Sequence, residues 1–103
     1  VVSLDLKAAP PTKCDALQTP FLGRHTFPIL RDRGAEAVQV SEAEVAAAMR
    51  LAFERLHLVV EPGGAVALAA VLAGKVELGA YPLVTLSGGN VDPTTYAAII
   101  AGI

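Results

Sequence analysis

The sequence predicts an α/β fold with a small, mainly parallel sheet flanked by helices, on three observations. Short apolar runs with β-branched residues, typical of buried parallel strands, alternate with segments of helical periodicity. The clearest helix follows a capping box, and the clearest strand, residues 83–86, runs into the sequence Ser-Gly-Gly-Asn at 87–90. The helical segments are longer than the strands, so we expect more helix than strand.

Length and composition indicate a partial domain. The 103 residues correspond to one domain or less, and we treat residues 1–103 as a single partial domain. Hydrophobic residues make up 53% and charged residues only 17%, although a chain this small has much surface to cover. Such an excess is usually covered by a partner or by another part of the protein. The chain starts at Val1 rather than methionine, which favours a processed chain or a piece of a longer one.

Charge and cysteine content argue against several classes of function. The net charge is −2 and no basic run occurs, so the footprint of a nucleic-acid-binding protein is missing. Cys14 is the single cysteine, which excludes an internal disulfide and favours a reducing, cytoplasmic setting. The longest uncharged apolar stretch, residues 65–74, is about half the length of a membrane span.

The first third of the chain is predicted to be largely irregular. Alternation over residues 2–6 indicates a weak strand, and residues 7–26 form a loop with one helical turn near 15–17. Residues 27–33 have the spacing of a short helix that ends at Gly34.

The best-defined helix is predicted over residues 42–57, after a short strand at 37–40. Ser41 and Glu44 have the spacing of a capping box, in which each side chain bonds the backbone N–H of the other residue. The apolar side chains then recur on one face, which predicts an amphipathic helix packed on a core. They are Val45, Met49, Ala52, Phe53 and Leu56.

The second half of the chain alternates two apolar runs with two helices. A short run at residues 58–60 precedes a helix at 65–73, which is apolar on every face and therefore predicted to be buried on every face. So small a body can hardly enclose it, which indicates that neighbouring protein is missing. After the strand at 83–86, Asp92 is predicted to cap a last helix at 93–101.

Ser87 and Glu61 are the candidate site residues. Ser87 is expected at the carboxyl end of a parallel strand, where open α/β sheets bind ligands. Gly88 and Gly89 would let the backbone approach a bound group, although the pattern alone favours a simple glycine turn. Glu61 precedes Pro-Gly-Gly, so its carboxylate could bond the free N–H groups of the next helix or point into a pocket.

Other chemistry is not indicated. His25 and His57 lack partners at ligand spacing, and no Ser-His or Cys-His pair suggests a triad. No P-loop or dinucleotide-binding glycine motif is present. We therefore predict no catalytic residue and no metal ligand in this chain.

Four segments in order resemble the carboxyl-terminal part of the threonine/serine dehydratase and serine racemase family. These are pyridoxal-phosphate enzymes of fold type II, the tryptophan synthase β-like fold. The resemblance covers about residues 14–92. The segments are Thr-Phe-Pro-Ile-Leu-Arg-Asp at 26–32, Val-Gln-Val-Ser-Glu-Ala-Glu-Val at 38–45, Leu-Val-Val-Glu-Pro-Gly-Gly-Ala at 58–65 and Leu-Ser-Gly-Gly-Asn-Val-Asp at 86–92.

The resemblance implies roles for individual residues. In that family the serine of the Ser-Gly-Gly-Asn stretch bonds the pyridine nitrogen of the cofactor, a role that would fall to Ser87. Glu61 matches a carboxylate near the same edge of the ring, and Gly88 and Gly89 would line the cofactor. The implied reaction is elimination of the hydroxyl group from serine or threonine, which yields a 2-oxo acid and ammonia.

The family's Schiff-base lysine segment and phosphate-binding glycines have no match in the chain. Lys7, Lys13 and Lys75 lie in other contexts, so no amine is expected to hold the cofactor. Whether the chain acts as an enzyme is therefore uncertain, and alone we expect it to be inactive and to bind no cofactor.

Three functions remain open. The first is a carboxyl-terminal fragment of such a lyase, which acts on a small amino acid in the parent and meets the parent's amino-terminal part or a second copy. The second is a freestanding non-catalytic module that self-associates or binds a protein partner through apolar helix faces. The third is a small-ligand binder that uses Ser87 and Glu61 without covalent chemistry.

Overall fold

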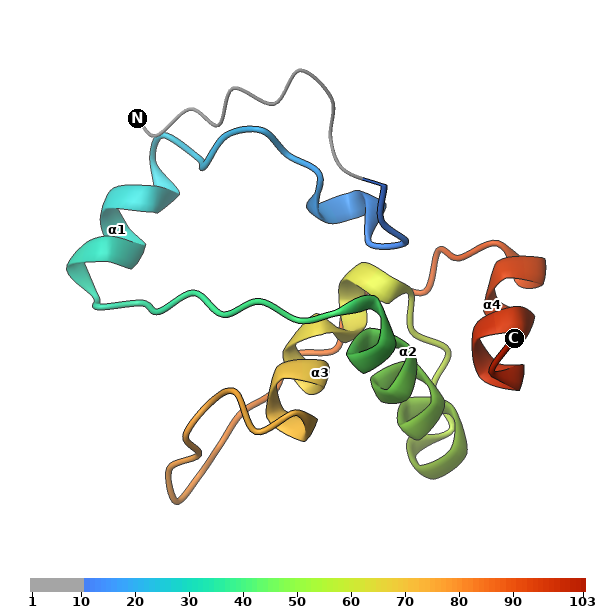
Figure 1. Cartoon of the computed structure of the whole chain (residues 1–103). Coiled ribbons are helices and arrows are strands. Elements are labelled where there is room, and N and C mark those ends of the chain that lie inside the picture. The colour runs from blue at the N-terminus through green and yellow to red at the C-terminus, as the bar shows by residue number, and fades with distance from the viewer. Residues whose placement is uncertain (1–10) are drawn as a thin grey trace. The chain divides into compact units, whose positions relative to one another are not determined.

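The computed structural model describes residues 11–103, and the chain divides into two compact units, Val1–Ala37 and Val38–Ile103. The strand predicted over residues 2–6 lies outside the described residues. All regular elements from residue 11 onward are helical, as Figure 1 shows. None of these helices is long and apolar enough to cross a membrane.

Between residues 11 and 37, the first unit contains two short helical elements, as predicted. A 3₁₀ turn spans Asp15–Leu17, and α1 spans Thr26–Asp32. Gly34 follows α1 with φ 68°, and the next N–H, of Ala35, bonds the Leu30 carbonyl oxygen at 2.9 Å. This is a Schellman ending, which requires a left-handed residue and favours glycine there.

The second unit is built around α2, Glu42–Leu51, which continues into a π-helical turn at Ala52–Leu56. The predicted capping box is confirmed. The Ser41 N–H donates to Glu44 Oε2 at 2.6 Å, and the Glu44 N–H donates to Ser41 Oγ at 3.3 Å. His57 has φ 56° and ends the helical turns, one residue earlier than predicted.

The helix α2 lies between α3, Val66–Leu72, and α4, Pro93–Ala101 (Figure 1). The predicted N-cap of α4 is confirmed, because Asp92 Oδ1 accepts the Thr95 N–H at 2.8 Å. The core between these elements is rich in alanine, which lets helices approach closely. Its buried members in this unit are Val45, Ala48, Met49, Ala52, Val60, Ala65, Ala69, Ala70 and Ile99.

Polar contacts fasten both ends of α2. Lys75 Nζ, just beyond α3, donates to the Gln39 carbonyl oxygen at 2.7 Å and to Glu44 Oε2 at 2.8 Å. Arg50 Nη1 donates to the Ile99 carbonyl oxygen of α4 at 2.9 Å. The lysine lowers the pKa of Glu44 below its ordinary value, with a further contribution from the Ser41 N–H.

The helix α3 is not buried on every face by the described residues, so the full burial predicted for it is not reached within this part of the chain. Only Ala69 and Ala70 within α3 are buried, and Leu72 is 47% exposed. The reason is that α2 and the 3₁₀ turn Pro62–Ala65 are the principal elements packed on α3 within the described chain. Its remaining apolar surface has no cover from these residues.

No strand forms among residues 11–103, so the predicted parallel sheet is not present in the described part of the chain. The expected strands at 37–40, 58–60 and 83–86 are irregular, and Leu83 is 94% exposed. A strand needs a neighbour for its N–H and C=O groups. Within the described chain, residues 76–86 make no backbone–backbone hydrogen bond.

Candidate functional site

Two loops far apart in the sequence lie side by side in the second unit. One is residues 59–64, which we call the glutamate loop, and the other is residues 87–90, the serine loop. The Glu61 N–H donates to the Gly88 carbonyl oxygen at 3.1 Å, and the Ser87 N–H donates to the Gly64 carbonyl oxygen at 3.3 Å. The fold therefore brings all four predicted site residues into one place.

The glutamate loop approaches the serine loop so closely that one position must be glycine. Gly64 is buried, and a Cβ atom there would overlap the Ser87 carbonyl oxygen. The 3₁₀ turn that contains Gly64 packs on α2, which leaves the turn little room to retreat. Gly64 was not among the predicted site residues, because the Gly-Gly pair alone does not reveal which backbone faces it.

Gly88 is constrained in a second way. Its φ is +71°, which disfavours any residue with a Cβ atom. In addition, a Cβ atom there would lie 2.5 Å from both Cδ and Oε1 of Glu61. The Glu61 carboxylate thus fills the space in which a side chain at position 88 would stand.

The carboxylate of Glu61 binds the serine loop. Glu61 Oε2 accepts the backbone N–H of Asn90 at 2.8 Å. Glu61 also precedes the 3₁₀ turn Pro62–Ala65, but its side chain makes no capping hydrogen bond there. The interpretation that this carboxylate caps the following helix is therefore wrong, and the partner it has instead, a distant backbone N–H, leaves no local signal in the sequence.

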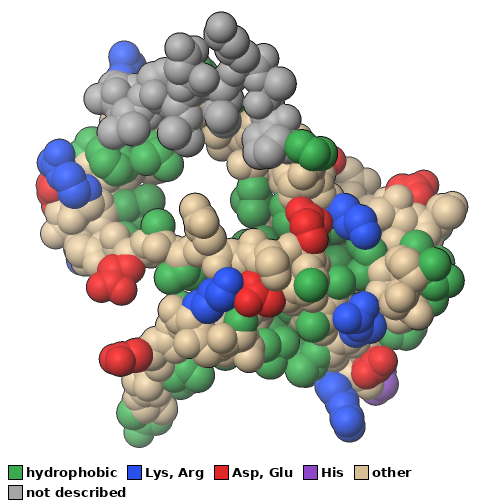
Figure 2. All heavy atoms as spheres, viewed as in Figure 1, with side chains coloured by type: hydrophobic (Ala, Val, Ile, Leu, Met, Phe, Trp, Pro, Cys, Tyr) green, Lys and Arg blue, Asp and Glu red, His purple; other side chains and the backbone are tan. Residues whose placement is uncertain are grey.

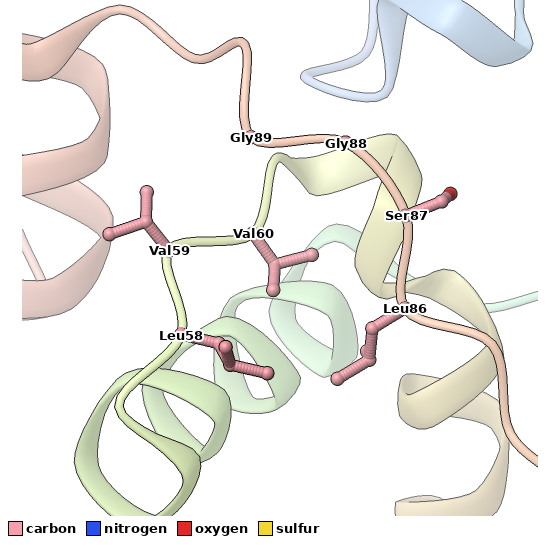
Figure 3. Close-up of a pocket in the computed structure, with 7 residues that line it drawn as sticks. All are labelled: Leu58, Val59, Val60, Leu86, Ser87, Gly88 and Gly89. Carbon is pink, nitrogen blue, oxygen red and sulfur yellow. The ribbon is translucent and has the colours of Figure 1, made fainter.

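Ser87 faces away from the core. The chain is extended here, so neighbouring side chains alternate in direction, and Figure 3 shows the Leu86 side chain turned toward Val60 and the Ser87 hydroxyl turned outward. Ser87 is exposed, whereas Leu86 is half-buried. A hydroxyl in this position is available to a group that approaches from outside the unit.

An open pocket of about 280 Å³ lies where the two loops meet. Side chains of Leu58, Val60 and Leu86 converge on one side of it (Figure 3). Gly88 and Gly89 also line it, but Glu61 does not. The lining residues are Leu58, Val59, Val60, Leu86, Ser87, Gly88 and Gly89.

The Lys75 amine is engaged away from these loops, with Gln39 and Glu44. Lys7 lies outside the described residues, and Lys13 belongs to the first unit. The described part of the second unit therefore places one serine hydroxyl, exposed glycine backbone and an apolar surface together, without a free amine among them.

Comparison with known proteins gives a consistent assignment. The family model described as pyridoxal-phosphate dependent enzyme matches residues 2–89. The chain is 40% identical over 94 residues to an L-threo-3-hydroxyaspartate ammonia-lyase from Pseudomonas sp, covering 90% of this chain and 30% of that protein. It is 41% identical over 90 residues to an L-threonine ammonia-lyase from Geobacter sulfurreducens, covering 86% of this chain and 22% of that protein.

A serine racemase from Homo sapiens is 36% identical over 90 residues, covering 84% of this chain and 26% of that protein. Among solved structures, the T.th. threonine deaminase matches with a TM-score of 0.77 and 47% identity, covering 86% of this chain and 32% of that chain. The chain thus spans less than a third of each of these proteins. The predicted resemblance is confirmed by similarity to ammonia-lyases, a serine racemase and a threonine deaminase, and the chain belongs to the pyridoxal-phosphate dependent enzymes.

Proposed function

We propose that this chain forms one wall of the pyridoxal-phosphate site of an ammonia-lyase that acts on a hydroxy amino acid. The observation that carries the proposal is the outward-facing hydroxyl of Ser87, held on a loop that is fastened to Glu61 and Gly64. Family membership and the names of the similar proteins support this cofactor and this reaction class, and the residue types at the two loops agree with both.

The residues fit one edge of the cofactor. A serine hydroxyl can donate a hydrogen bond to an unprotonated pyridine nitrogen or accept one from its protonated form. Gly88 and Gly89 are exposed and leave the backbone bare, so a flat ring can approach closely. When bound, pyridoxal phosphate draws electrons from the α-carbon of the amino acid, which permits loss of the β-hydroxyl group.

Ser87 would set the strength of that electron withdrawal. A neutral hydroxyl does not compel the ring nitrogen to hold a proton, whereas a carboxylate at the same place would. The ring then withdraws electrons moderately, which suits elimination of a β-hydroxyl group. We assign to Ser87 the orientation of the ring edge and the control of the proton at its nitrogen.

The remainder of the site must come from polypeptide beyond the described residues. The family resemblance implies two anchors for the cofactor, a glycine-rich loop that binds its phosphate and a lysine that bonds it covalently. The second unit contains neither. We therefore expect the chain alone to be inactive and to have no lasting hold on the cofactor.

Exposed apolar side chains on the second unit support the proposal that another polypeptide covers it. Tyr81 is 97% exposed and Leu83 is 94% exposed, and Figure 2 shows apolar side chains spread over the visible face of the molecule. The rest of a parent enzyme in the cytoplasm is the cover that we propose. The same exposure favours the second candidate function, a freestanding module that self-associates or binds another protein.

A chimera tests the proposal. This chain would replace the matching part of the T.th. threonine deaminase, of which it covers 32%. We expect the chimera with pyridoxal phosphate to release a 2-oxo acid from threonine, and Ser87→Ala to reduce that rate roughly a hundredfold, the effect typical of a lost electrostatic contact. Formation of the 2-oxo acid by the chain alone would contradict the proposal. Sedimentation of the free chain as a stable dimer would support the second function.

A further inference from the structure

We infer that Glu61 is a positioning residue for Ser87, and that its carboxylate holds the serine loop rather than the cofactor. The inference deepens the proposed function, on which it rests for the identity of the ligand. The contacts that carry it belong to the chain alone, so they can be tested without any cofactor.

The serine loop is fastened on both sides of Ser87. Before the side chain, the Ser87 N–H is bound to the Gly64 carbonyl oxygen. After it, the Gly88 carbonyl oxygen accepts the Glu61 N–H, and the Asn90 N–H is bound to Glu61 Oε2 at 2.8 Å. Three of the loop's backbone groups thus have partners in the glutamate loop, and Glu61 provides two of them.

The carboxylate also acts as a steric wedge. It lies against the Cα of Gly88, where a Cβ atom would be 2.5 Å from Cδ and Oε1 of Glu61. Because Gly88 has a positive φ and the carboxylate blocks one side of its Cα, few other backbone conformations are open to it. Movement of Gly88 would carry Ser87 with it, so the wedge restrains the direction of the hydroxyl.

The contacts of the carboxylate argue against a direct role in binding the ligand. Glu61 Oε2 is bound to the Asn90 N–H and the carboxylate lies against Gly88, whereas the Ser87 hydroxyl is turned outward. A carboxylate that accepts a backbone N–H forms a charge-assisted bond, which is stronger than a bond between neutral groups. Glu61 therefore acts on the site through the backbone of the serine loop.

Amide hydrogen exchange of the free chain tests whether the Glu61 carboxylate holds the serine loop. We expect Glu61→Ala to speed exchange at the Asn90 N–H roughly tenfold, because the amide loses its acceptor. Glu61→Gln keeps an acceptor oxygen and should restore most of the protection. The Thr95 N–H, bound to Asp92 Oδ1 at the same 2.8 Å, is the matched control and should not change. Unchanged exchange at Asn90 in Glu61→Ala would overturn the inference.

The chimera separates this inference from the proposed function. With pyridoxal phosphate bound, we expect Glu61→Ala to move the pH profile of the cofactor absorbance in the direction of Ser87→Ala, and Glu61→Gln to restore it. One outcome is that Ser87→Ala leaves the pH profile unchanged while Glu61→Ala still speeds exchange at the Asn90 N–H. In that case the proposed function fails, but the role of Glu61 in holding the serine loop is upheld. If Ser87→Ala moves the profile and Glu61→Ala does not, the positioning role is overturned.

Discussion

The serine loop and the segment that precedes it differ sharply, although they are adjacent in the chain. Residues 87–90 are bound to the glutamate loop through Glu61 and Gly64. Residues 76–86 make no backbone–backbone hydrogen bond within the described chain, and Leu83 in that segment is 94% exposed. The described residues therefore hold the serine loop in place but leave the segment before it without backbone partners.

The largest effect is expected where the two loops touch. Gly64→Ala would place a Cβ atom on the Ser87 carbonyl oxygen, so we expect a loss of about 2–3 kcal/mol in the free energy of unfolding. Urea titration followed by circular dichroism measures it. Gly79→Ala is the control, because nothing lies within 4 Å of that Cβ. Equal losses at the two positions would show that the loops do not touch in solution.

At Gly88, a smaller effect on the free energy of unfolding distinguishes a clash with the Glu61 carboxylate from the strain of a positive φ. Gly88 and Gly74 have φ of +71° and +66°, so alanine at either position costs about 1–2 kcal/mol. Only Gly88 faces a carboxylate, so Gly88→Ala should cost roughly 1 kcal/mol more than Gly74→Ala. When Glu61→Ala is also present, the two glycine substitutions should cost the same free energy of unfolding, as measured by their urea midpoints. An excess that persists would place the carboxylate elsewhere.

A pH dependence is expected from the polar contacts that hold α2 and α4. The Lys75 amine and the Ser41 N–H lower the pKa of Glu44 from its ordinary 4.5, and the Thr95 N–H lowers that of Asp92 from 3.8. A depressed pKa in the folded state stabilises it above the unfolded pKa, and this stability is lost as the pH falls through the folded pKa. The urea midpoint should therefore drop below about pH 4.5, and Glu44→Gln should flatten that drop. An identical pH profile in Glu44→Gln would contradict the Lys75 contact.

The smallest effect on folding is expected in the exposed segment. Leu83→Ser should change the free energy of unfolding by less than about 0.5 kcal/mol, because this side chain has almost no cover in the chain. In the chimera, the same substitution should impair assembly with the remaining polypeptide, measured by the yield of folded enzyme. A large loss of stability in the free chain would show that Leu83 is buried there.

Local signals in the sequence predicted the helices and their ends. The Ser41–Glu44 capping box, the Asp92 cap and the end of α1 at Gly34 each depend on residues within a few positions of one another. The strands failed because pairing requires neighbours that residues 11–103 do not provide. The same reason exposes the outer face of α3, which is apolar but lacks cover.

The sequence predicted which residues gather at the candidate site, but not the contacts between them. Ser87, Gly88, Gly89 and Glu61 came from a motif and an implied family, and the structure gathers them at one place. The roles of Gly64 and of the Asn90 N–H depend on the approach of two distant loops, which no spacing encodes. The cofactor contacts themselves stay a prediction.

Hydrogen exchange across residues 76–90 tests the central claim most directly, because it compares the two adjacent regions in one measurement. In the free chain, we predict protection at Ser87 and Asn90 and none over residues 76–86. In the chimera with the T.th. threonine deaminase, residues 76–86 should also become protected, because we expect the polypeptide of that enzyme to pair with them. Protection of residues 76–86 in the free monomer, or its absence in the folded chimera, would contradict the account.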